Sequence, residues 1–305
     1  MLLWNRTQIA AKIETVEGSP ESLSANDVLL GANVSFKPNI EMGERPLVSA
    51  SISSFGKAPG AQSATISFDV ELKGSGEAGT PPEFGKLLRA CGMSETINEG
   101  TSVIYQPASA EIPSLTIACI IDGKKYQAAG CRGTFRLDLR KGEPGILHFD
   151  FTGTNISNED QNLFQGVEYL ELLPPVFQDA NLQIDSFAAI VEALSIELGN
   201  NVVLRPDANA QQGYKCAVIT KRESKLTFNP EDVAVSDYDF LSKWKNGSFL
   251  ALSFALQGGA GNNIAISCPK VQFEDISPAE RDGIAVLEIT GILVGHDDEL
   301  KLEFT

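Results

Sequence analysis

Few side chains in this sequence could carry out catalysis or bind a metal ion. The sequence holds two histidines, and one of them, His148, alternates with Asp150 along a segment with strand periodicity. That pair could supply half of a metal site, but the sequence indicates no third ligand, and a solvated strand face is the simpler interpretation. His296 lies between Gly295 and Asp297 with no implied partner. The carboxylates are scattered along polar strand faces without forming an acid/base pair, so we predict no enzyme and no metal.

Residues 74–79, Gly-Ser-Gly-Glu-Ala-Gly, have the form of a dinucleotide-binding fingerprint between a strand and a helix. Such a site needs the helix to begin at the glycines, inside a parallel βαβ unit, so that backbone amides face the pyrophosphate. Here Thr80, Pro81 and Pro82 separate the glycines from the predicted helix, and the strands that follow have hairpin spacing. A flexible turn is the better interpretation, and we predict no cofactor.

The cysteines indicate buried thiols and not a disulfide framework. Their number is odd, they form no C-x-x-C motif, and most lie within apolar strand patterns, at positions 91, 119, 131, 216 and 268.

Charge narrows the class of partner. The chain has 40 acidic and 24 basic residues, a formal charge of −16. Proteins that bind nucleic acid neutralise phosphates with Lys and Arg, so sequence-specific DNA recognition is disfavoured. The N-terminus has no signal-peptide pattern, and no stretch of about 18 apolar residues occurs. We therefore expect a soluble product made in the cytosol, with no membrane partner.

The sequence contains one block of predicted strands twice, in residues 114–153 and residues 249–291. Each block is an alternating strand, a Gly turn, a strand through a Cys, a polar turn and a closing strand that ends in Thr-Gly. Residues 145–146 align with 283–284, and residues 152–153 with 290–291. Upstream, residues 30–38 align with residues 198–206 without a gap. These aligned segments predict two divergent copies of one β-rich module.

Between these signals each copy has a strand followed by one short helix. In the first copy, residues 64–73 alternate as a half-buried strand, and residues 80–83 resemble a capping box. The helix would bury Phe84, Leu87, Leu88 and Cys91 and end at Gly92. In the second copy the strand covers residues 225–229, and the cap lies at residues 236–239. The buried helix face would be Phe240, Leu241 and Trp244, and the helix would end at residues 246–247. The fold class is therefore predicted as mainly β with short helices: two β-sandwiches or barrels, each flanked by one helix.

The predicted organisation has four parts. An N-terminal arm (residues 1–29) precedes a first domain (30–154), a connector (155–180) and a second domain (181–305). Within the first domain, residues 41–63 form a long connection rich in Gly and Pro, whereas its counterpart, residues 207–213, is short. Long connections of this kind are usually functional, so we predict an extended hairpin or arm in the first copy alone.

In their order and duplication, several motifs together resemble the major tail tube proteins of long-tailed, siphovirus-like bacteriophages, in the larger form with two tube domains. The motifs that carry the resemblance lie at residues 9–15, 70–76, 87–92, 102–107 and 198–206. The resemblance implies a structural virion protein of the phage tail, assembled in the host bacterial cytoplasm. Its subunits would join their sheets into ring-shaped barrels, trimeric and pseudo-sixfold because two domains are fused. Stacked rings would form the conduit through which DNA is delivered into the host.

The resemblance also assigns surfaces and partners. The long connection would dock one ring onto the next, with Glu44, Arg45, Ser54, Phe55 and Lys57 as candidate contact residues. Polar strand faces would line the lumen, with Asp69, Glu71, Asp138, Asp150, Glu274 and Glu288 as candidates. DNA would pass along this acidic lining without specific binding. The partners would be other copies of the chain and the tail tip, tape measure and terminator proteins.

Two other interpretations remain open. A two-domain β-sandwich binding module, such as an adhesin or tail-tip component, would need an exposed aromatic platform, but Trp4 lies in the arm and Trp244 on a predicted buried helix face. In the other interpretation the ring is hexameric and the second domain decorates its outside. That arrangement predicts a second copy without the strand and helix patterns, and the sequence has both.

Overall fold

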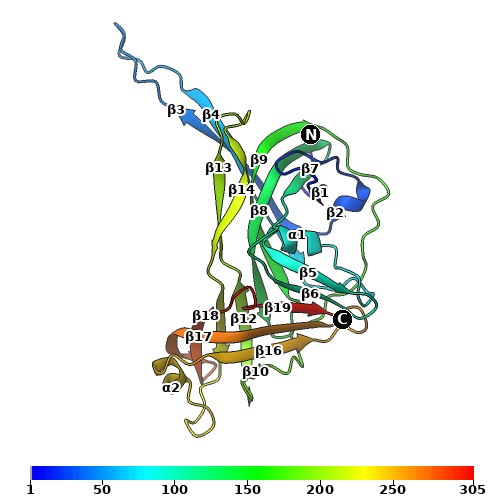
Figure 1. The fold of residues 1–305 in the computed structure, drawn as a ribbon, viewed down its shortest axis with the longest axis vertical. Coiled ribbons are helices and arrows are strands. Elements are labelled where there is room, and N and C mark those ends of the chain that lie inside the picture. The colour runs from blue at the N-terminus through cyan, green and yellow to red at the C-terminus, as the bar shows by residue number, and fades with distance from the viewer. Residues whose placement is uncertain (1) are drawn as a thin grey trace.

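The computed structural model describes residues 2–305, which fold mainly as β-strands. Two short α-helices, α1 (Gly85–Ala90) and α2 (Phe240–Lys245), and a 3-10 turn, η1 (Ala25–Asp27), complete the secondary structure of these residues. The loop between strands β3 and β4 projects from one end of the long axis, and α2 lies toward the opposite end (Figure 1). Among the described residues, neither helix has the length and apolarity needed to cross a membrane.

Eight antiparallel strands form the main sheet. In spatial order they are β3 (Ala32–Gly43), β4 (Ala58–Glu71), β9 (Ile146–Asp160), β8 (Lys124–Arg140), β12 (Val191–Glu197), β15 (Lys225–Pro230), β18 (Ile284–Leu293) and β17 (Ile264–Arg281). The junction between β8 and β12 joins the two halves of the chain into one sheet. We call this junction the β8–β12 seam.

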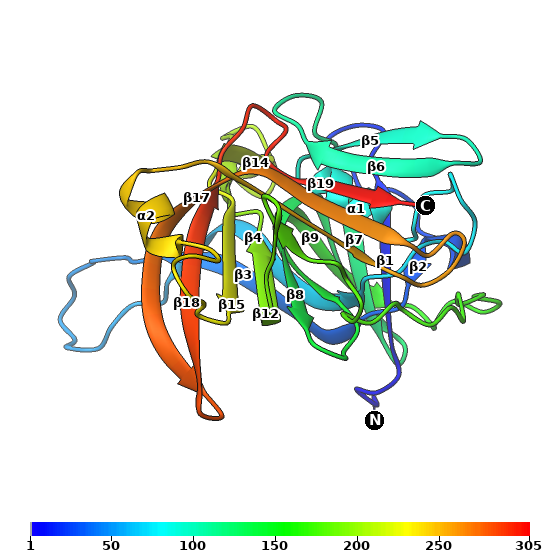
Figure 2. The ribbon, with the colours of Figure 1, turned by 90° about the horizontal axis from the view of Figure 1, so that it is seen from below.

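Further strands extend from the first halves of β8 and β17. On β8 they are β7 (Leu115–Ile121), β1 (Thr7–Ile13) and β2 (Val28–Leu29). On β17 they are β16 (Leu250–Leu256) with β10 (Gln183–Ile184) and β11 (Phe187–Ala188) on one side, and β19 (Lys301–Phe304), β6 (Ser102–Pro107) and β5 (Met93–Asn98) on the other. Figure 2, a view from below, shows β19, β6 and β5 side by side. The hairpin of β13 (Asn200–Pro206) and β14 (Tyr214–Arg222) is a separate two-stranded sheet.

The core follows from alternation along the strands, because successive side chains point to opposite faces. Phe68 on β4 and Phe149 and Phe151 on β9 are fully buried with ring centroids 5.9–6.0 Å apart. On the C-terminal strand, Phe304 packs edge-on against Tyr105 of β6. One cluster of buried apolar side chains therefore runs through both halves of the chain.

The predicted fold class, mainly β with short helices, is confirmed, and the helices differ in detail. Helix α1 begins at Gly85 and has no side-chain cap, because Thr80 Oγ1 donates to Glu77 instead, so the predicted capping box is wrong. The four residues predicted to be buried around α1 are all buried. In α2, Asp239 caps the helix by accepting from the Ser242 amide at 2.9 Å. Leu241, predicted to be buried, is 47% exposed, since α2 packs mainly through Phe240.

Two strands extend the first half of the sheet beyond residues 30–154. The segment expected as an N-terminal arm contains β1, which pairs with β7 along its whole length, and β9 continues to Asp160, inside the expected connector. Residues 30–38 and 198–206, aligned in the sequence, occupy different places. The former lead into β3 of the main sheet, whereas the latter leave β12 at Gly199 and enter β13. Gly199 has φ +67°, a left-handed conformation that bends the chain there. All five cysteines are free and buried, as predicted.

Candidate assembly surfaces

The main sheet has one polar face, opposite the aromatic core. All six candidate lumen residues lie on its strands. Five alternate with buried neighbours: Asp69 and Glu71 on β4, Asp138 on β8, Asp150 on β9 and Glu288 on β18. Glu274 on β17 lies at a bulge between buried Phe273 and exposed Asp275, and it reaches Lys225 on the polar face of β15. The polar face is hollowed around the β8–β12 seam, where a depression of about 570 Å³ is lined by polar side chains that include Asp138, His148, Ser195, Thr227 and Glu288. The six residues therefore share a face, although they come from both halves of the chain.

His148 links three neighbouring strands on this face. Its Nδ1 lies 2.6 Å from Asp69 Oδ1 on β4, and its Nε2 lies 3.2 Å from Asp138 Oδ2 on β8. Asp138 is also within 3.1 Å of Arg136 Nε. The pairing of His148 with Asp150, considered for a metal, is therefore replaced by contacts to two other carboxylates. Within residues 2–305, no group of three His, Cys, Asp or Glu side chains is arranged to hold a metal ion.

Polar contacts continue across the β8–β12 seam. Ser195 on β12 lies opposite Asp138 on β8, and its hydroxyl donates to the Asp138 carboxylate at 2.6 Å. The row continues in register through Thr227 on β15 and Thr290 on β18. Two residues along, Arg136 lies opposite Glu197. The seam therefore carries both backbone pairing and side-chain complementarity.

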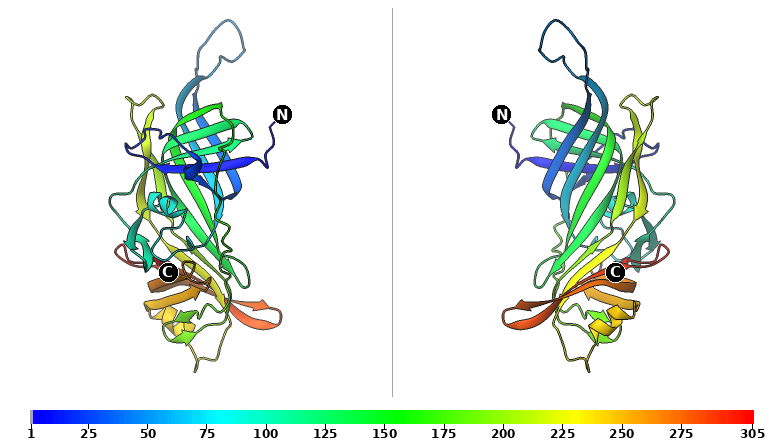
Figure 3. Two further views of the ribbon diagram at one scale, coloured as in Figure 1. Left: turned by 90° about the vertical axis from the view of Figure 1, so that its right-hand side faces the viewer. Right: turned by 90° about the vertical axis from the view of Figure 1, so that its left-hand side faces the viewer.

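The main sheet ends in two unpaired edges. At one end, β3 has a partner strand, β4, on one side only among the described residues. At the other end, the second half of β17, from residue 272 to Arg281, pairs with β18 alone within residues 2–305. The second half of β17 and its turn to β18 project from the body of the molecule (Figure 3). Long open edges have unpaired backbone groups that invite another strand to pair with them.

We use the term arm for the distal part of the β3–β4 hairpin, residues 39–62, whose loop is residues 44–57. All five candidate inter-ring residues lie in this loop, and Lys57 forms an exposed ion pair with Glu44 at 2.9 Å. Apolar side chains at the tip are almost fully exposed, Val48 at 101% and Ile52 at 108%. Exposed apolar groups clustered on one projecting element usually mark a protein contact.

The turn of the β13–β14 hairpin braces the base of the arm. The Gln62 amide donates to the Gln212 carbonyl at 2.9 Å, and the Tyr214 hydroxyl donates to Glu41. Gln212 also exchanges two hydrogen bonds with the backbone of Ile156 on β9. Sequence reasoning missed this brace because its members lie 56 residues or more apart along the chain.

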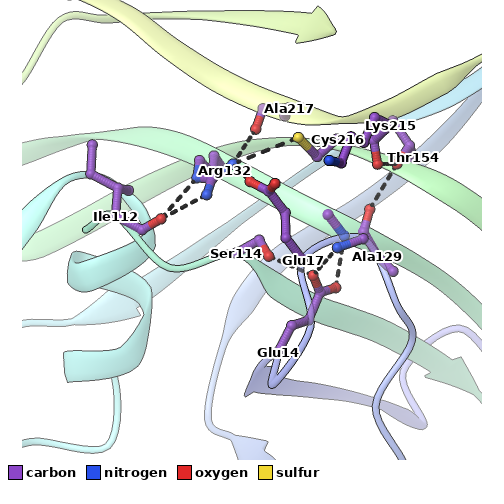
Figure 4. Close-up of polar contacts among 12 residues, drawn as sticks. Glu14, Glu17, Ile112, Ser114, Ala129, Arg132, Thr154, Lys215, Cys216 and Ala217 are labelled. Atoms are coloured by element: carbon purple, nitrogen blue, oxygen red, sulfur yellow. Dashed lines mark hydrogen bonds and ion pairs between the residues drawn. The ribbon is translucent and has the colours of Figure 1, made fainter. Parts of the chain in front are cut away.

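Arg132 fixes the same hairpin to β8 (Figure 4). Its guanidinium donates to the carbonyls of Ala217 on β14, at 2.6 Å, and of Ile112, at 2.7 Å, and pairs with Glu17 at 2.7 Å. Partial burial raises the pKa of Glu17, but the hydrogen bond and charge of Arg132 outweigh this and leave the pKa below its ordinary value. Nearby, the buried Glu14 carboxylate accepts from the Gly130 amide at 2.7 Å and from two hydroxyls.

The glycine loop of residues 74–79 is a contact between the two halves of the chain. The Gly74 amide donates to Asn262 Oδ1 at 2.7 Å, and the Gly76 amide donates to the Gly261 carbonyl at 3.0 Å. A Cβ atom at Gly74 would lie 2.0 Å from that carbonyl oxygen, so only glycine allows the approach. The loop precedes α1 by several residues and does not present its glycines at a helix N-terminus.

These features describe a β-rich structural protein with edges and projections suited to assembly. The model of the family described as phage tail tube protein matches residues 4–303, and the chain therefore belongs to that family. It is a structural component of a phage virion tail. No curated protein matches the sequence.

Proposed function

We propose that this tail tube protein self-assembles into closed trimeric rings, and that stacked rings form the conduit for DNA delivery into the host. The observation that carries the proposal is the β8–β12 seam. It joins two four-stranded units within one chain and leaves one edge open at each end of the main sheet, β3 at one and β17 at the other.

The two halves of the main sheet support a duplication. The order β3, β4, β9, β8 is repeated as β12, β15, β18, β17. Thr65 lies opposite Thr152 in the first unit, and Thr227 lies opposite Thr290 in the second. We infer two tube domains, residues 30–154 and 181–305, with residues 155–180 between them. By this equivalence the open edge of β17 corresponds to the edge of β8, and β3 corresponds to β12.

The seam then supplies a register for the contact between chains. His148 lies four residues before Thr152, and Val286 lies four residues before the equivalent Thr290. Arg136 lies opposite His148, and Ala279 lies opposite Val286. Arg136 thus corresponds to Ala279, and by the same steps Glu197 corresponds to Asn39. Because Arg136 faces Glu197 across the seam, we infer that Ala279 faces Asn39 of the next chain, with the strands antiparallel.

One apposition in this register brings like charges together, Arg281 and Lys37 of the next chain. Arg281 is already within 3.2 Å of Glu192 and 3.9 Å of Glu231 in its own chain. Those carboxylates offset the positive charge, so the apposition costs little.

Barrel geometry favours several chains. A closed barrel of about eight strands has an interior just wide enough for side chains, whereas an aqueous channel needs roughly 16 or more. Three chains would supply 24 main-sheet strands. With a strand spacing of about 4.8 Å and a tilt of about 40°, the backbone diameter would be roughly 50 Å. That leaves room for a DNA duplex inside the side-chain lining.

The polar face is the inferred lumen lining. Its candidates are the six carboxylates on β4, β8, β9, β17 and β18, and several of them are offset by local ion pairs, as for Glu274 with Lys225 at 3.1 Å. A weakly negative lining repels phosphates without trapping them, so DNA could slide. The arm, with its candidates Glu44, Arg45, Ser54, Phe55 and Lys57, is the inferred contact to the next ring.

The further partners that we infer are the tail tip, tape measure and terminator proteins of a siphovirus-like tail. We infer that assembly takes place in the cytoplasm of the host bacterium. The surfaces that would meet these partners are the two ends of the stacked rings.

The direct test combines electron microscopy of the purified protein with cysteine cross-linking. Negative-stain end views should show hollow rings of threefold or pseudo-sixfold symmetry. The double variant Asn39→Cys/Ala279→Cys should give a non-reducing gel ladder that ends at three chains. The matched control, Asn39→Cys/Glu280→Cys, places one thiol on the opposite face of β17 and should remain uncross-linked. A monodisperse monomer that gives no ladder would overturn the ring and favour a binding module.

A further inference from the structure

The end of the molecule opposite the arm exposes apolar side chains. Val235 is 72% exposed, Phe249 58% and Leu241 47%, on the loop before α2, the start of β16 and α2 itself. Ile190, which precedes β12, is 61% exposed. Its carbonyl accepts from the Glu231 amide, which lies in the loop before α2. We use the term α2 end for Ile190, residues 231–239, Leu241 and Phe249. It lies toward the opposite end of the long axis from the arm (Figures 1 and 3).

The α2 end is held in place by its own packing. Tyr238 stacks on Phe187 of β11 with ring centroids 4.8 Å apart and contacts Phe240 edge-on at 4.7 Å. Lys243 of α2 pairs with Asp185 at 3.5 Å. The exposed apolar side chains therefore stand on a supported surface and not on a free loop.

Charge distinguishes the two ends of the molecule. Residues 231–249, which include α2, carry four acids and two bases, Lys243 and Lys245, and Asp232 and Asp237 are exposed. The loop of the arm, residues 44–57, carries two bases and one acid in a chain whose formal charge is −16. Its acid, Glu44, is paired with Lys57, whereas the Arg45 guanidinium has no ion-pair partner among residues 2–305. The projecting loop is thus a cationic, apolar element, and the α2 end is an anionic, apolar surface.

We propose that the α2 end is the seat for the arm of a second copy of this chain in the adjacent ring. This inference rests on the proposed function and adds the receiving surface to it. The two surfaces differ from one another and lie at opposite ends of one molecule, so their contact is heterologous and repeats along an axis. Burial of Val48 and Ile52 against Val235, Leu241 and Phe249 supplies the apolar part of the contact. Asp232 and Asp237 supply acceptors for Arg45.

Each chain then has one arm and one seat. The second domain has no spare arm, because its β13–β14 hairpin is engaged within the chain through Gln212, Tyr214 and Arg132. A trimeric ring therefore makes three inter-ring contacts on each side.

The test uses two full-length single variants, Val48→Cys and Val235→Cys, one of which carries an affinity tag. The native thiols are buried, so only the introduced thiols are available. Under mild oxidation of a mixture, the mixed dimer should form. A mixture of Val48→Cys with the control Val16→Cys, which is 63% exposed in the wild type, should not give it. If rings and tubes form while Val48→Cys couples equally to both partners, the seat is wrong and the proposed function stands. If the wild-type protein forms no ordered assembly and the two variants form no mixed dimer, both the seat and the proposed function are wrong.

A charge exchange tests the same contact by a second readout. The readout is the mixed dimer of Val48→Cys with Val235→Cys. We expect Arg45→Glu alone to abolish this dimer, and the pair Asp232→Lys/Asp237→Lys alone to do the same. All three charge changes together should restore it. The control Glu99→Lys/Glu111→Lys alters two exposed acids elsewhere and should leave the yield unchanged. Loss of the dimer in the single sets without recovery in the combination would overturn the pairing of Arg45 with these carboxylates.

Discussion

Gln212 and Ile156 exchange two hydrogen bonds at the base of the arm. The Ile156 amide donates to Gln212 Oε1 at 2.7 Å, and Gln212 Nε2 donates to the Ile156 carbonyl at 2.9 Å. The pairing of β4 with β9 ends at Gly153, and at Ile156 the Gln212 side chain takes the place of a partner strand. The Gln212 backbone carbonyl also accepts from the Gln62 amide of the arm. A residue from the second half of the chain therefore helps to set the direction of an element in the first half.

Gln212→Ala should destabilise the protein by about 1–3 kcal/mol, since it leaves two partly buried backbone groups of Ile156 without partners. Urea unfolding of purified protein gives the value. Gln165→Ala is the matched control, because the Gln165 side chain is exposed and, among residues 2–305, bonds only to the Leu163 carbonyl. Equal stability of the two variants would contradict the bracing role.

Removal of the arm loop should separate ring formation from stacking. Gly43 and Ala58 are paired in the β3–β4 register, so Asn-Gly in place of residues 44–57 makes a two-residue hairpin turn. We expect soluble rings that no longer form tubes in electron micrographs, and the same result for the larger deletion of residues 43–62. Tubes of normal length from either variant would refute the stacking role of the arm.

Gly74→Ala should lower the free energy of unfolding by about 1–3 kcal/mol or more, because the new Cβ overlaps the Gly261 carbonyl. Thermal and urea unfolding measure the effect. Gly56→Ala is the control in the arm loop, where a Cβ meets no atom within 4 Å. Wild-type stability for Gly74→Ala would show that the two loops separate without loss.

Acid should weaken the Glu17–Arg132 pair. The pKa of Glu17 is lowered from 4.5 in the folded protein, because Arg132 outweighs the effect of burial. Its contribution to stability is therefore full above about pH 4.5 and is lost as the pH falls through the folded value. The difference in unfolding free energy between wild type and Glu17→Gln should be largest near pH 7 and shrink below pH 4.5. A difference that stays constant from pH 7 to pH 3 would contradict this sign.

The native thiols should be unreactive toward a thiol reagent at pH 8 until the protein unfolds. Burial raises the pKa of Cys119 and of Cys268 to about 12 and also raises that of Cys91, Cys131 and Cys216. Thiolates are therefore scarce and inaccessible in the folded state. Val16→Cys, at a side chain that is 63% exposed in the wild type, serves as the positive control and should react at once. Rapid labelling of a wild-type thiol would locate a region that opens in solution.

Local pattern was sufficient to predict much of the fold. The alternation of Ile66, Phe68, Val70 and Leu72 predicted the buried face of β4, and the polar positions between them placed Asp69 and Glu71 on the opposite face. Pattern failed where distant contacts decide the outcome. The capping box at Thr80 was wrong because Thr80 bonds to Glu77 within the glycine loop, and that loop is held by Asn262 and Gly261, which are nearly 190 residues away. The brace at Gln212 and the anchor at Arg132 left no local signal, because polar residues in turns and strands are usually solvated.

The β8–β12 seam also affects the kinetics of assembly. In the proposed ring, three of the six junctions between tube domains lie within chains and form when each chain folds. Every association event costs translational and rotational freedom, estimated at about 4–15 kcal/mol. Three linked pairs need two encounters and one closure, whereas six separate domains would need five encounters. Fusing two domains therefore removes three of the five encounters at which a growing ring could stall as an incomplete arc.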